Sequence, residues 1–206
     1  MSPPKRTLPS PDPSPGKRVR LFAAVDLGAE LIDRVHRLIT PLHAQAPNAR
    51  WASPDGMHLT LFFFGSVSLT MVAPLQDALG RAAEGHGPLR LRVQGSGGFG
   101  TLAHPRVLWL GLQGDLQPLA ALQASVTGQV SALGFEAEHR AFSPHLTLAR
   151  AKAPRGDPAL AACRDALRTL DAGEAQVDAL VLYRSEPSPQ GSRYTALQRY
   201  PLRHAR

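Results

Sequence analysis

Cysteine and long apolar runs are scarce in this chain. Its 206 residues include one cysteine, and no apolar run approaches the roughly 20 residues of a membrane-spanning helix. A single cysteine excludes an intramolecular disulfide, and the basic N-terminus lacks the apolar core of a secretory signal. Cys163 lies in the helical pattern LAACRDAL, where a small buried side chain is its expected role. The sequence therefore predicts a protein of the reducing cytoplasm that has no membrane partner.

Acidic and aromatic residues are also few. Lysine and arginine number 23 against 16 aspartates and glutamates, which gives a net charge of +7. A basic chain favours anionic partners such as RNA, DNA or nucleotides. Residues 1–18 hold +3 of this charge, and the +4 that remains fits a solvated surface about as well as an RNA groove.

The first 18 residues, MSPPKRTLPSPDPSPGKR, contain six prolines and no apolar periodicity. Such a segment buries too little surface to offset its ordering entropy, so it predicts a flexible tail. Its cations either add non-specific attraction to RNA or aid solubility. The rest of the chain, 19–206, is predicted to form a single two-lobed domain.

The remaining pattern alternates short apolar strands with amphipathic helices. The prediction is an α+β fold of two pseudo-symmetric lobes, with antiparallel or mixed sheets that face each other across a cleft and helices outside. Each half of the chain is expected to supply one lobe, as in an internal duplication. In GSGGFG, a hairpin or bulge is favoured over a phosphate cradle, because no P-loop ending follows. The expected strands cover 19–27, 57–64, 89–97, 105–112, 176–184 and 192–199, and the expected helices 29–44, 68–83, 116–133 and 157–170.

Two copies of the tetrapeptide HLTL are the most informative feature. On a strand, residues i and i+2 share a face, so His58 projects with Thr60, and His145 projects with Thr147. The intervening leucines, and the phenylalanines after the first copy, are expected to form a buried scaffold. One such histidine is usually structural, but two matched copies favour function.

Facing lobes would bring these four polar side chains together. Two imidazoles suit paired acid and base catalysis near neutral pH, and threonine hydroxyls suit phosphate oxygens. Arg150, at the end of the second motif, is a candidate for binding the phosphate bidentately. A metal centre is disfavoured, because neither motif has the three or more His, Cys or carboxylate ligands that such a centre needs.

The paired motifs resemble those of the two-histidine (2H) phosphoesterase superfamily. Within this superfamily, the chain is similar to the bacterial and archaeal RNA 2′,3′-cyclic phosphodiesterases, which are also described as 2′-5′ RNA ligases. Supporting stretches are RLFAAVDL (20–27), HPRVLWLGL (104–112), FSPHLTLAR (142–150) and LYRSEPSPQGSRYTAL (182–197). The resemblance implies hydrolysis of a terminal 2′,3′-cyclic phosphate to a 2′-phosphate without metal, ATP or other cofactor. It also implies reversible 2′-5′ joining of RNA ends as a side activity.

By the same resemblance, His58 is the acid that protonates the departing 3′ oxygen and His145 is the base that activates water. Thr60, Thr147 and Arg150 hold the phosphate. Because the two motifs are nearly symmetric, the opposite assignment, with His145 as the acid and His58 as the base, stays open. The expected partner is an RNA end, with no obligate protein partner and a monomeric state.

Contacts beyond the phosphate are less defined. Phe22 and Phe142 are candidates for stacking on a base, although core packing is favoured for both, and Arg106 and Arg193 are candidates for backbone phosphates. Two other readings stay open: a phosphodiesterase of a small cyclic phosphate, such as an ADP-ribose cyclic phosphate or a cyclic nucleotide, and a non-catalytic nucleotide-binding module.

Overall fold

The computed structural model describes residues 17–136, 140–188 and 191–204. The predicted tail lies outside the described residues except for Lys17 and Arg18, and the first strand begins at Arg18, one residue earlier than expected. In chain order the elements are β1 (Arg18–Val25), α1 (Ala29–Ile39), η1 (Thr40–Ala44), β2 (Arg50–Trp51), η2 (Pro54–Gly56), β3 (Leu59–Ser68), η3 (Leu69–Met71), α2 (Val72–Ala83), β4 (Leu89–Gly100), β5 (Pro105–Gly114), α3 (Leu116–Ser131), β6 (Leu146–Arg150), α4 (Pro158–Ala166), β7 (Asp171–Val177), β8 (Ala179–Ser188) and β9 (Gly191–Pro201).

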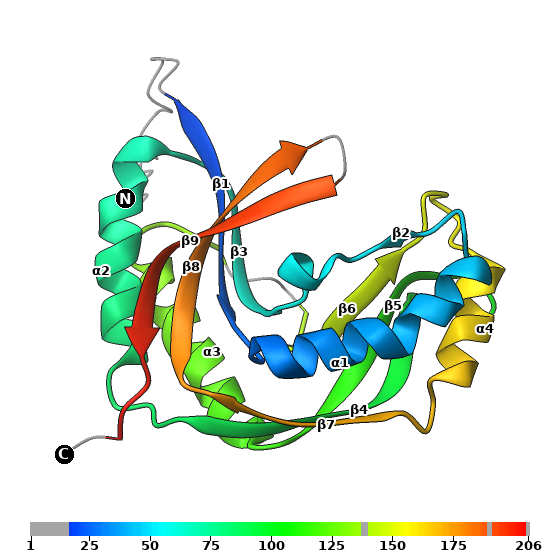
Figure 1. Ribbon diagram of the computed structural model, residues 1–206. Coiled ribbons are helices and arrows are strands. Elements are labelled where there is room, and N and C mark those ends of the chain that lie inside the picture. The colour runs from blue at the N-terminus through cyan, green and yellow to red at the C-terminus, as the bar shows by residue number, and fades with distance from the viewer. Residues whose placement is uncertain (1–16, 137–139, 189–190, 205–206) are drawn as a thin grey trace, which may run out of the picture.

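The strands form two antiparallel sheets (Figure 1). Sheet A has the order β3-β1-β8-β9, and sheet B has the order β2-β6-β5-β4-β7. Helix α2 contacts sheet A, helices α1 and α4 contact sheet B, and α3 contacts β3 of sheet A and β4 of sheet B. The predicted α+β class with two sheets and outer helices is therefore confirmed.

The two sheets are not the two halves of the chain, and this expectation was wrong. Sheet A combines β1 and β3 with the C-terminal hairpin β8–β9, while the middle of the chain builds sheet B. Because β1 pairs with β8 as well as with β3, the ends of the described chain close one sheet together. Each HLTL motif still falls on a different sheet.

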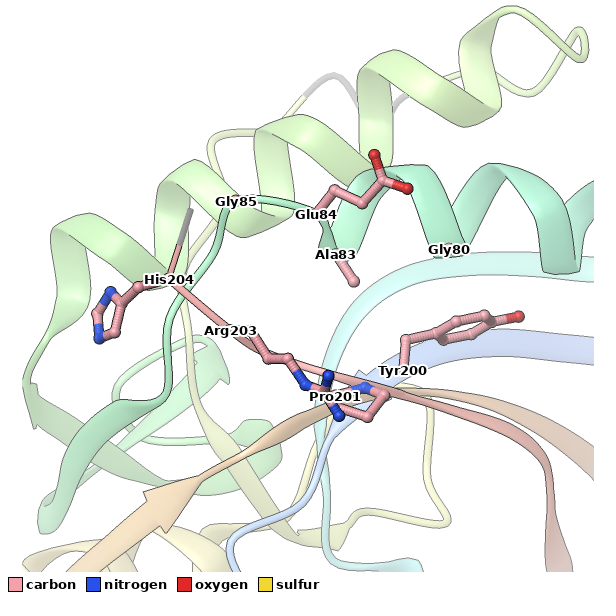
Figure 2. A pocket seen from close by; sticks show the side chains of 8 residues that line it. All are labelled: Gly80, Ala83, Glu84, Gly85, Tyr200, Pro201, Arg203 and His204. Atoms are coloured by element: carbon pink, nitrogen blue, oxygen red, sulfur yellow. The ribbon is translucent and has the colours of Figure 1, made fainter. Parts of the chain in front are cut away.

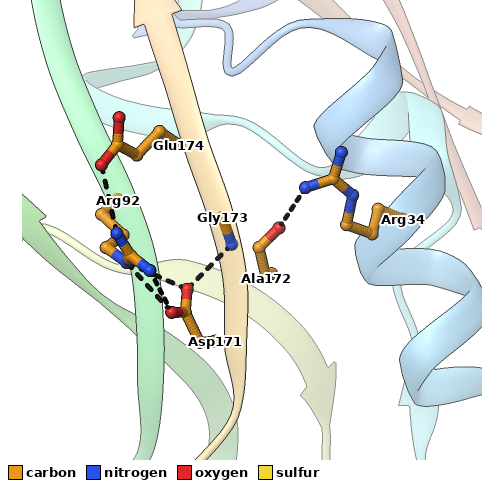
Figure 3. A network of polar contacts seen from close by, with 6 residues as sticks. All are labelled: Arg34, Arg92, Asp171, Ala172, Gly173 and Glu174. Carbon is orange, nitrogen blue, oxygen red and sulfur yellow. Dashed lines mark hydrogen bonds and ion pairs between the residues drawn. The ribbon is translucent and has the colours of Figure 1, made fainter.

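The predicted strand 176–184 is in fact two strands that belong to different sheets. Strand β7 ends at Val177 in sheet B and β8 begins at Ala179 in sheet A, with Asp178 between them. The start of β7, DAGEAQV, was missed because small and charged residues hide its alternating burial. Polar contacts hold this strand: Asp171 and Glu174 pair with Arg92 of β4, and Arg34 of α1 donates to the carbonyl oxygen of Ala172 at 3.1 Å (Figure 3).

The predicted helices are present with shorter α-helical parts. The helix expected over 29–44 continues as the 3₁₀ turn η1 after Ile39, next to Pro41, and the one expected over 157–170 ends at Ala166. Among the described residues, no helix combines the length and the apolar character that crossing a membrane requires.

Side chains on each strand divide between a core face and a second face that carries the motifs. On β1, Leu21, Ala23 and Val25 are buried in the hydrophobic core, whereas Arg20 and Phe22 point to the other side of sheet A. We use "motif face" for the side of each sheet that carries its HLTL threonine. For sheet A it includes Arg20, Phe22, Ala24, Thr60, Phe63 and Tyr183, and for sheet B it includes Gly97, Phe99, Val107, Trp109, Thr147 and Arg150.

Candidate active site

The first motif enters sheet A at its edge. His58 lies immediately before β3, and Thr60 pairs with Ala24 of β1 and is exposed. Leu59 and Leu61 are buried in the core, as the sequence predicted. The motif therefore anchors itself through its leucines and presents its polar residues on the other side.

The phenylalanines after this motif do not all join the scaffold. Phe62 and Phe64 are buried, but Phe63 is 49% exposed. Two irregularities in the pairing of β1 with β3 explain the difference, because one residue of β3 is skipped between Thr60 and Phe62 and another between Phe63 and Gly65. The expectation that all of these phenylalanines are buried was therefore wrong for Phe63.

The first of these bulges places Phe63 on the same face as Thr60. Thr60 is opposite Ala24, and Phe63 is opposite Phe22. Ala24 and Phe22 are two residues apart on β1 and share a face, so their partners on β3 share it too. Without a bulge, residues three apart would lie on opposite faces.

Aromatic rings surround His58. Its imidazole stacks on Phe22 with ring centroids 4.5 Å apart, and Tyr183 lies 5.6 Å away. Tyr194 meets the imidazole edge-on at 5.1 Å. Phe22 is only 2% exposed, so its contacts support His58 and leave it no open surface for a base.

Asp26, which was not predicted from the sequence, influences the pKa of His58. Asp26 accepts hydrogen bonds from Tyr183 Oη at 2.6 Å and from Arg199 Nη1 at 2.8 Å. Burial lowers the pKa of His58 to about 4, while the negative charge of Asp26 acts in the opposite direction and favours the protonated ring. The signal in the sequence was an aspartate that ends the apolar run RLFAAV.

The second motif repeats this plan on sheet B. His145 lies immediately before β6, and its Nδ1 is 2.7 Å from the carbonyl oxygen of Ser143. A carbonyl only accepts, so in the neutral ring Nδ1 carries the hydrogen and Nε2 keeps its lone pair. Burial lowers the pKa of His145; the Ser143 contact raises it, and the charge of Arg150 lowers it.

A bulge in β6 also re-aims a side chain. Thr147 is opposite Trp109 and Arg150 is opposite Val107, so both partners lie on one face of β5. The extra residue in β6 therefore brings Arg150 onto the face of Thr147, although the two are three residues apart. Phe63 in the first motif and Arg150 in the second occupy equivalent positions.

Aromatic side chains position His145 as well. Phe99 meets the imidazole edge-on with centroids 4.8 Å apart, and Trp109 lies 6.1 Å away. Gly97 makes room for this indole, because a Cβ at that position would lie 2.1 Å from the Trp109 ring. Of the hairpin or bulge predicted in GSGGFG, the structure has a bulge between Val93 and Ser96, and Gly97 makes room for Trp109.

One short segment ties the two motifs together. The Ala52 N–H, just after β2, donates to the Leu148 carbonyl of β6 at 2.7 Å. His58 follows six residues later, a length of chain that spans at most about 20 Å when fully extended. Between them η2 contacts β9, and a Cβ at Gly56 would lie 3.2 Å from the Tyr194 ring. Figure 1 shows this segment running from β6 to the start of β3.

The other predicted contact residues are Phe142, Arg106 and Arg193, and they stay predictions. Phe142 is half-buried and packs against the hydrophobic core. Arg106 is exposed and is the extra residue of β5 at an irregularity, between Pro105, which is opposite Gly100, and Val107, which is opposite Phe99. The backbone of Arg193 is opposite that of Glu186 in the pairing of β8 with β9, and its neighbour Tyr194 takes the motif face.

A hollow of about 300 Å³ lies elsewhere on the molecule, between the end of α2 and the end of β9 (Figure 2). Tyr200 and His204 line it, and neither motif does. Within the described residues, no group of three or more His, Cys, Asp or Glu side chains is arranged to hold a metal ion.

A comparison with models of protein families identifies the superfamily of the chain. The model of the 2′-5′ RNA ligase superfamily matches residues 27–188. The chain belongs to this superfamily. The assignment made from the paired HLTL motifs is therefore confirmed.

Individual members of the superfamily align over most of the chain. The RNA 2′,3′-cyclic phosphodiesterase of Methanothermobacter thermautotrophicus is 32% identical over 185 residues, which are 90% of this chain and 100% of that protein. The enzyme of that name from Thermus thermophilus is 34% identical, over 90% and 91% of the two chains. A crystal structure of Escherichia coli LigT complexed with 3′-AMP superposes with a TM-score of 0.72 at 28% identity, and covers 90% of this chain and 99% of that one.

Proposed function

We propose that the chain is an RNA 2′,3′-cyclic phosphodiesterase, which hydrolyses a terminal cyclic phosphate to a 2′-phosphate through His58 and His145. One observation carries the proposal: each motif combines a half-buried histidine, a threonine and a bulge that adds a third side chain to the same face. The relatives that align over most of the chain bear the same activity in their names.

In the proposed reaction, water attacks phosphorus in line with the bond to the 3′ oxygen. Nε2 of His145 takes a proton from the water, because the Ser143 carbonyl holds the hydrogen on Nδ1. As the bond from phosphorus to the 3′ oxygen breaks, protonated His58 gives its proton to that oxygen. The products are a 3′ hydroxyl and a 2′-phosphate monoester.

The remaining motif residues serve the phosphate. Thr60 and Thr147 donate hydrogen bonds to its non-bridging oxygens, and Arg150 balances the charge that develops there. Arg150 and Thr147 share one face of β6, which supports their acting on one group. None of these steps calls for a metal ion.

The proposed acid must carry a proton when the substrate is bound. The pKa of His58 is about 4 in the free protein, so the ring is mainly neutral at pH 7. A bound phosphodiester anion adds a second negative charge to that of Asp26 and raises this pKa. Substrate binding thus favours the protonated form of His58. When RNA ends are joined 2′-5′ in the reverse direction, the two histidines exchange their roles as acid and base.

The proposal takes the 3′ end of an RNA as the partner and a cytoplasmic monomer as the acting unit. The test is incubation, with EDTA, of an oligoribonucleotide that ends in a 2′,3′-cyclic phosphate, followed by identification of the product isomer. We expect a 2′-phosphate from the wild type and at least a thousandfold lower rate from His58→Ala and from His145→Ala. His86→Ala, on the turn after α2, is the matched control. A 3′-phosphate product, or activity abolished by EDTA, would refute the proposal.

A further inference from the structure

Two arginines lie directly opposite each other at the edge of sheet B. Arg50 of β2 pairs with Arg150 of β6, and both side chains are exposed. Opposite residues of neighbouring strands share a face, so Arg50 lies on the motif face together with Arg150 and Thr147. Like charges in this arrangement repel each other and destabilise a sheet. The mechanism proposed above uses Arg150 but gives Arg50 no part.

Neighbouring carboxylates do not relieve this repulsion. Among the residues that the structure describes, neither guanidinium forms an ion pair with an acidic side chain. The segment that follows Arg150 adds the exposed cations Lys152 and Arg155 before the first acid, Asp157. This end of sheet B is therefore positive, and an anion supplied from outside would relieve the repulsion.

Strand β2 is held so that Arg50 keeps this position. Trp51, the next residue, packs against the hydrophobic core, and its Nε1 donates to the carbonyl oxygen of Ala46 at 3.1 Å. The centroid of the Trp51 ring also lies 4.4 Å from that of the His43 imidazole. Because successive residues of a strand alternate, the burial of Trp51 directs Arg50 away from the core. The packing thus maintains a like-charge pair that does not stabilise the fold, which is typical of a binding site.

The charges of the ligand decide what Arg50 can hold. A cyclic phosphate is a diester with one negative charge, and Arg150 balances that charge in the proposed mechanism. A second guanidinium beside it matches a second anion. In an RNA strand this anion is the phosphodiester on the 5′ oxygen of the terminal nucleotide, whereas a nucleoside cyclic phosphate with a free 5′ hydroxyl has none.

We propose that Arg50 binds the phosphodiester on the 5′ side of the terminal nucleotide while Arg150 binds the cyclic phosphate. This inference rests on the proposed function and deepens it, because Arg50 then makes an RNA strand a better substrate than a small cyclic phosphate. Lys152 and Arg155 add to the positive potential that attracts the strand.

The first experiment compares adenosine 2′,3′-cyclic phosphate that has a free 5′ hydroxyl with the same compound carrying a 5′ methyl phosphate, which reproduces the single charge of an internal phosphodiester. The wild type is expected to have about a tenfold higher kcat/KM for the second substrate, because a charge-assisted hydrogen bond contributes roughly that factor. Arg50→Gln is expected to lose most of this preference through a higher KM. Its kcat/KM for the first substrate should stay within about twofold of the wild type.

Two further variants control this comparison. Arg50→Lys keeps the charge without the bidentate geometry, so it is expected to keep part of the preference. Arg37→Gln, exposed on α1, also removes one positive charge and should leave the preference unchanged. An equal loss of kcat/KM for both substrates in Arg50→Gln would place Arg50 on the reacting phosphate and overturn the proposal, and an unchanged preference in this variant would overturn it as well.

Binding without turnover separates this inference from the proposed function. Isothermal titration calorimetry measures Kd for adenosine 2′-phosphate with and without the 5′ methyl phosphate. The added group is expected to tighten binding to the wild type and to Arg37→Gln about tenfold, and to Arg50→Gln less than about twofold. This result supports the role of Arg50 even if no cyclic phosphate is hydrolysed. Hydrolysis by the wild type, together with an equal gain in affinity for the wild type and Arg50→Gln, would refute that role and leave the proposed function standing.

Discussion

The imidazole of His58 stacks on the ring of Phe22, with centroids 4.5 Å apart and planes inclined by 25°. This contact removes the imidazole from water, and burial is the main cause that lowers its pKa to about 4. In the unfolded chain the same group titrates near 6.5. The stack therefore links a candidate catalytic group to the stability of the fold.

Acid should destabilise the wild type through this group. Between pH 6.5 and 4 the unfolded state binds a proton that the folded state does not, so stability falls as pH falls through this range. The loss amounts to about 2–3 kcal/mol at pH 4.5. His58→Phe removes the titrating group, and urea unfolding at pH 7 and pH 4.5 should show a correspondingly smaller loss. His104→Phe, an exposed position, is the control; equal acid losses in all three proteins would contradict this origin.

Asp26 should set how readily His58 holds its proton. Asp26→Asn removes the charge that favours the imidazolium, so the pKa of His58 falls further. We expect kcat at pH 7 to fall about tenfold, with the limb of the kcat profile that reports the acid moving to lower pH. Tyr183→Phe removes one hydrogen bond to Asp26 but keeps the charge of Asp26, so the acid limb of the kcat profile should stay in place for this variant. A shift in Tyr183→Phe as large as that in Asp26→Asn would argue against the charge as the cause.

Arg150 should act on both the phosphate and the base. Its positive charge lowers the pKa of His145, so Arg150→Gln raises that pKa and moves the rising limb of the kcat/KM profile to higher pH. The lost phosphate contact should reduce kcat/KM about a hundredfold. Arg150→Lys should restore the position of the limb but only part of the rate, because an ammonium cannot bind bidentately. An unmoved limb in Arg150→Gln would contradict the coupling.

Gly97→Ala should disturb the packing beneath His145. The added methyl group would lie 2.1 Å from the Trp109 ring, so the indole must move. Thermal or urea unfolding is expected to show a loss of about 1–3 kcal/mol, with a reduced rate because His145 contacts the same ring. Gly128→Ala in α3, where the added group meets nothing within 4 Å, is the control and should be neutral or stabilising. A Gly97→Ala protein as stable as Gly128→Ala would show that the ring adapts freely.

The sequence predicted which side chains of each motif are buried, because a strand has a simple period. Alternation alone predicted that Thr60 and Thr147 lie on the face opposite the core and that the leucines lie in the core. The bulges that follow Thr60 in β3 and Thr147 in β6 could not be predicted in this way, because a pattern of period two does not show where an extra residue is inserted. For that reason Phe63 was expected inside.

Long-range pairings set the other limit. Asp26 and Tyr183 are 157 residues apart in the chain, and only the pairing of β1 with β8 brings them together. The division of the strand expected at 176–184 between two sheets depends on the same closure of the C-terminal hairpin onto β1. Local patterns do not record which distant strand will be a neighbour.

A substrate with an altered leaving group separates the acid from the base. In a cyclic phosphate with sulfur in place of the 3′ oxygen, the leaving thiolate needs no proton from the enzyme, since thiols titrate near pH 8.5. If His58 is the acid and His145 the base, His58→Ala cleaves this substrate within about tenfold of the wild-type rate, while His145→Ala remains at least a thousandfold slower. Rescue of His145→Ala instead, or of neither variant, would contradict this assignment.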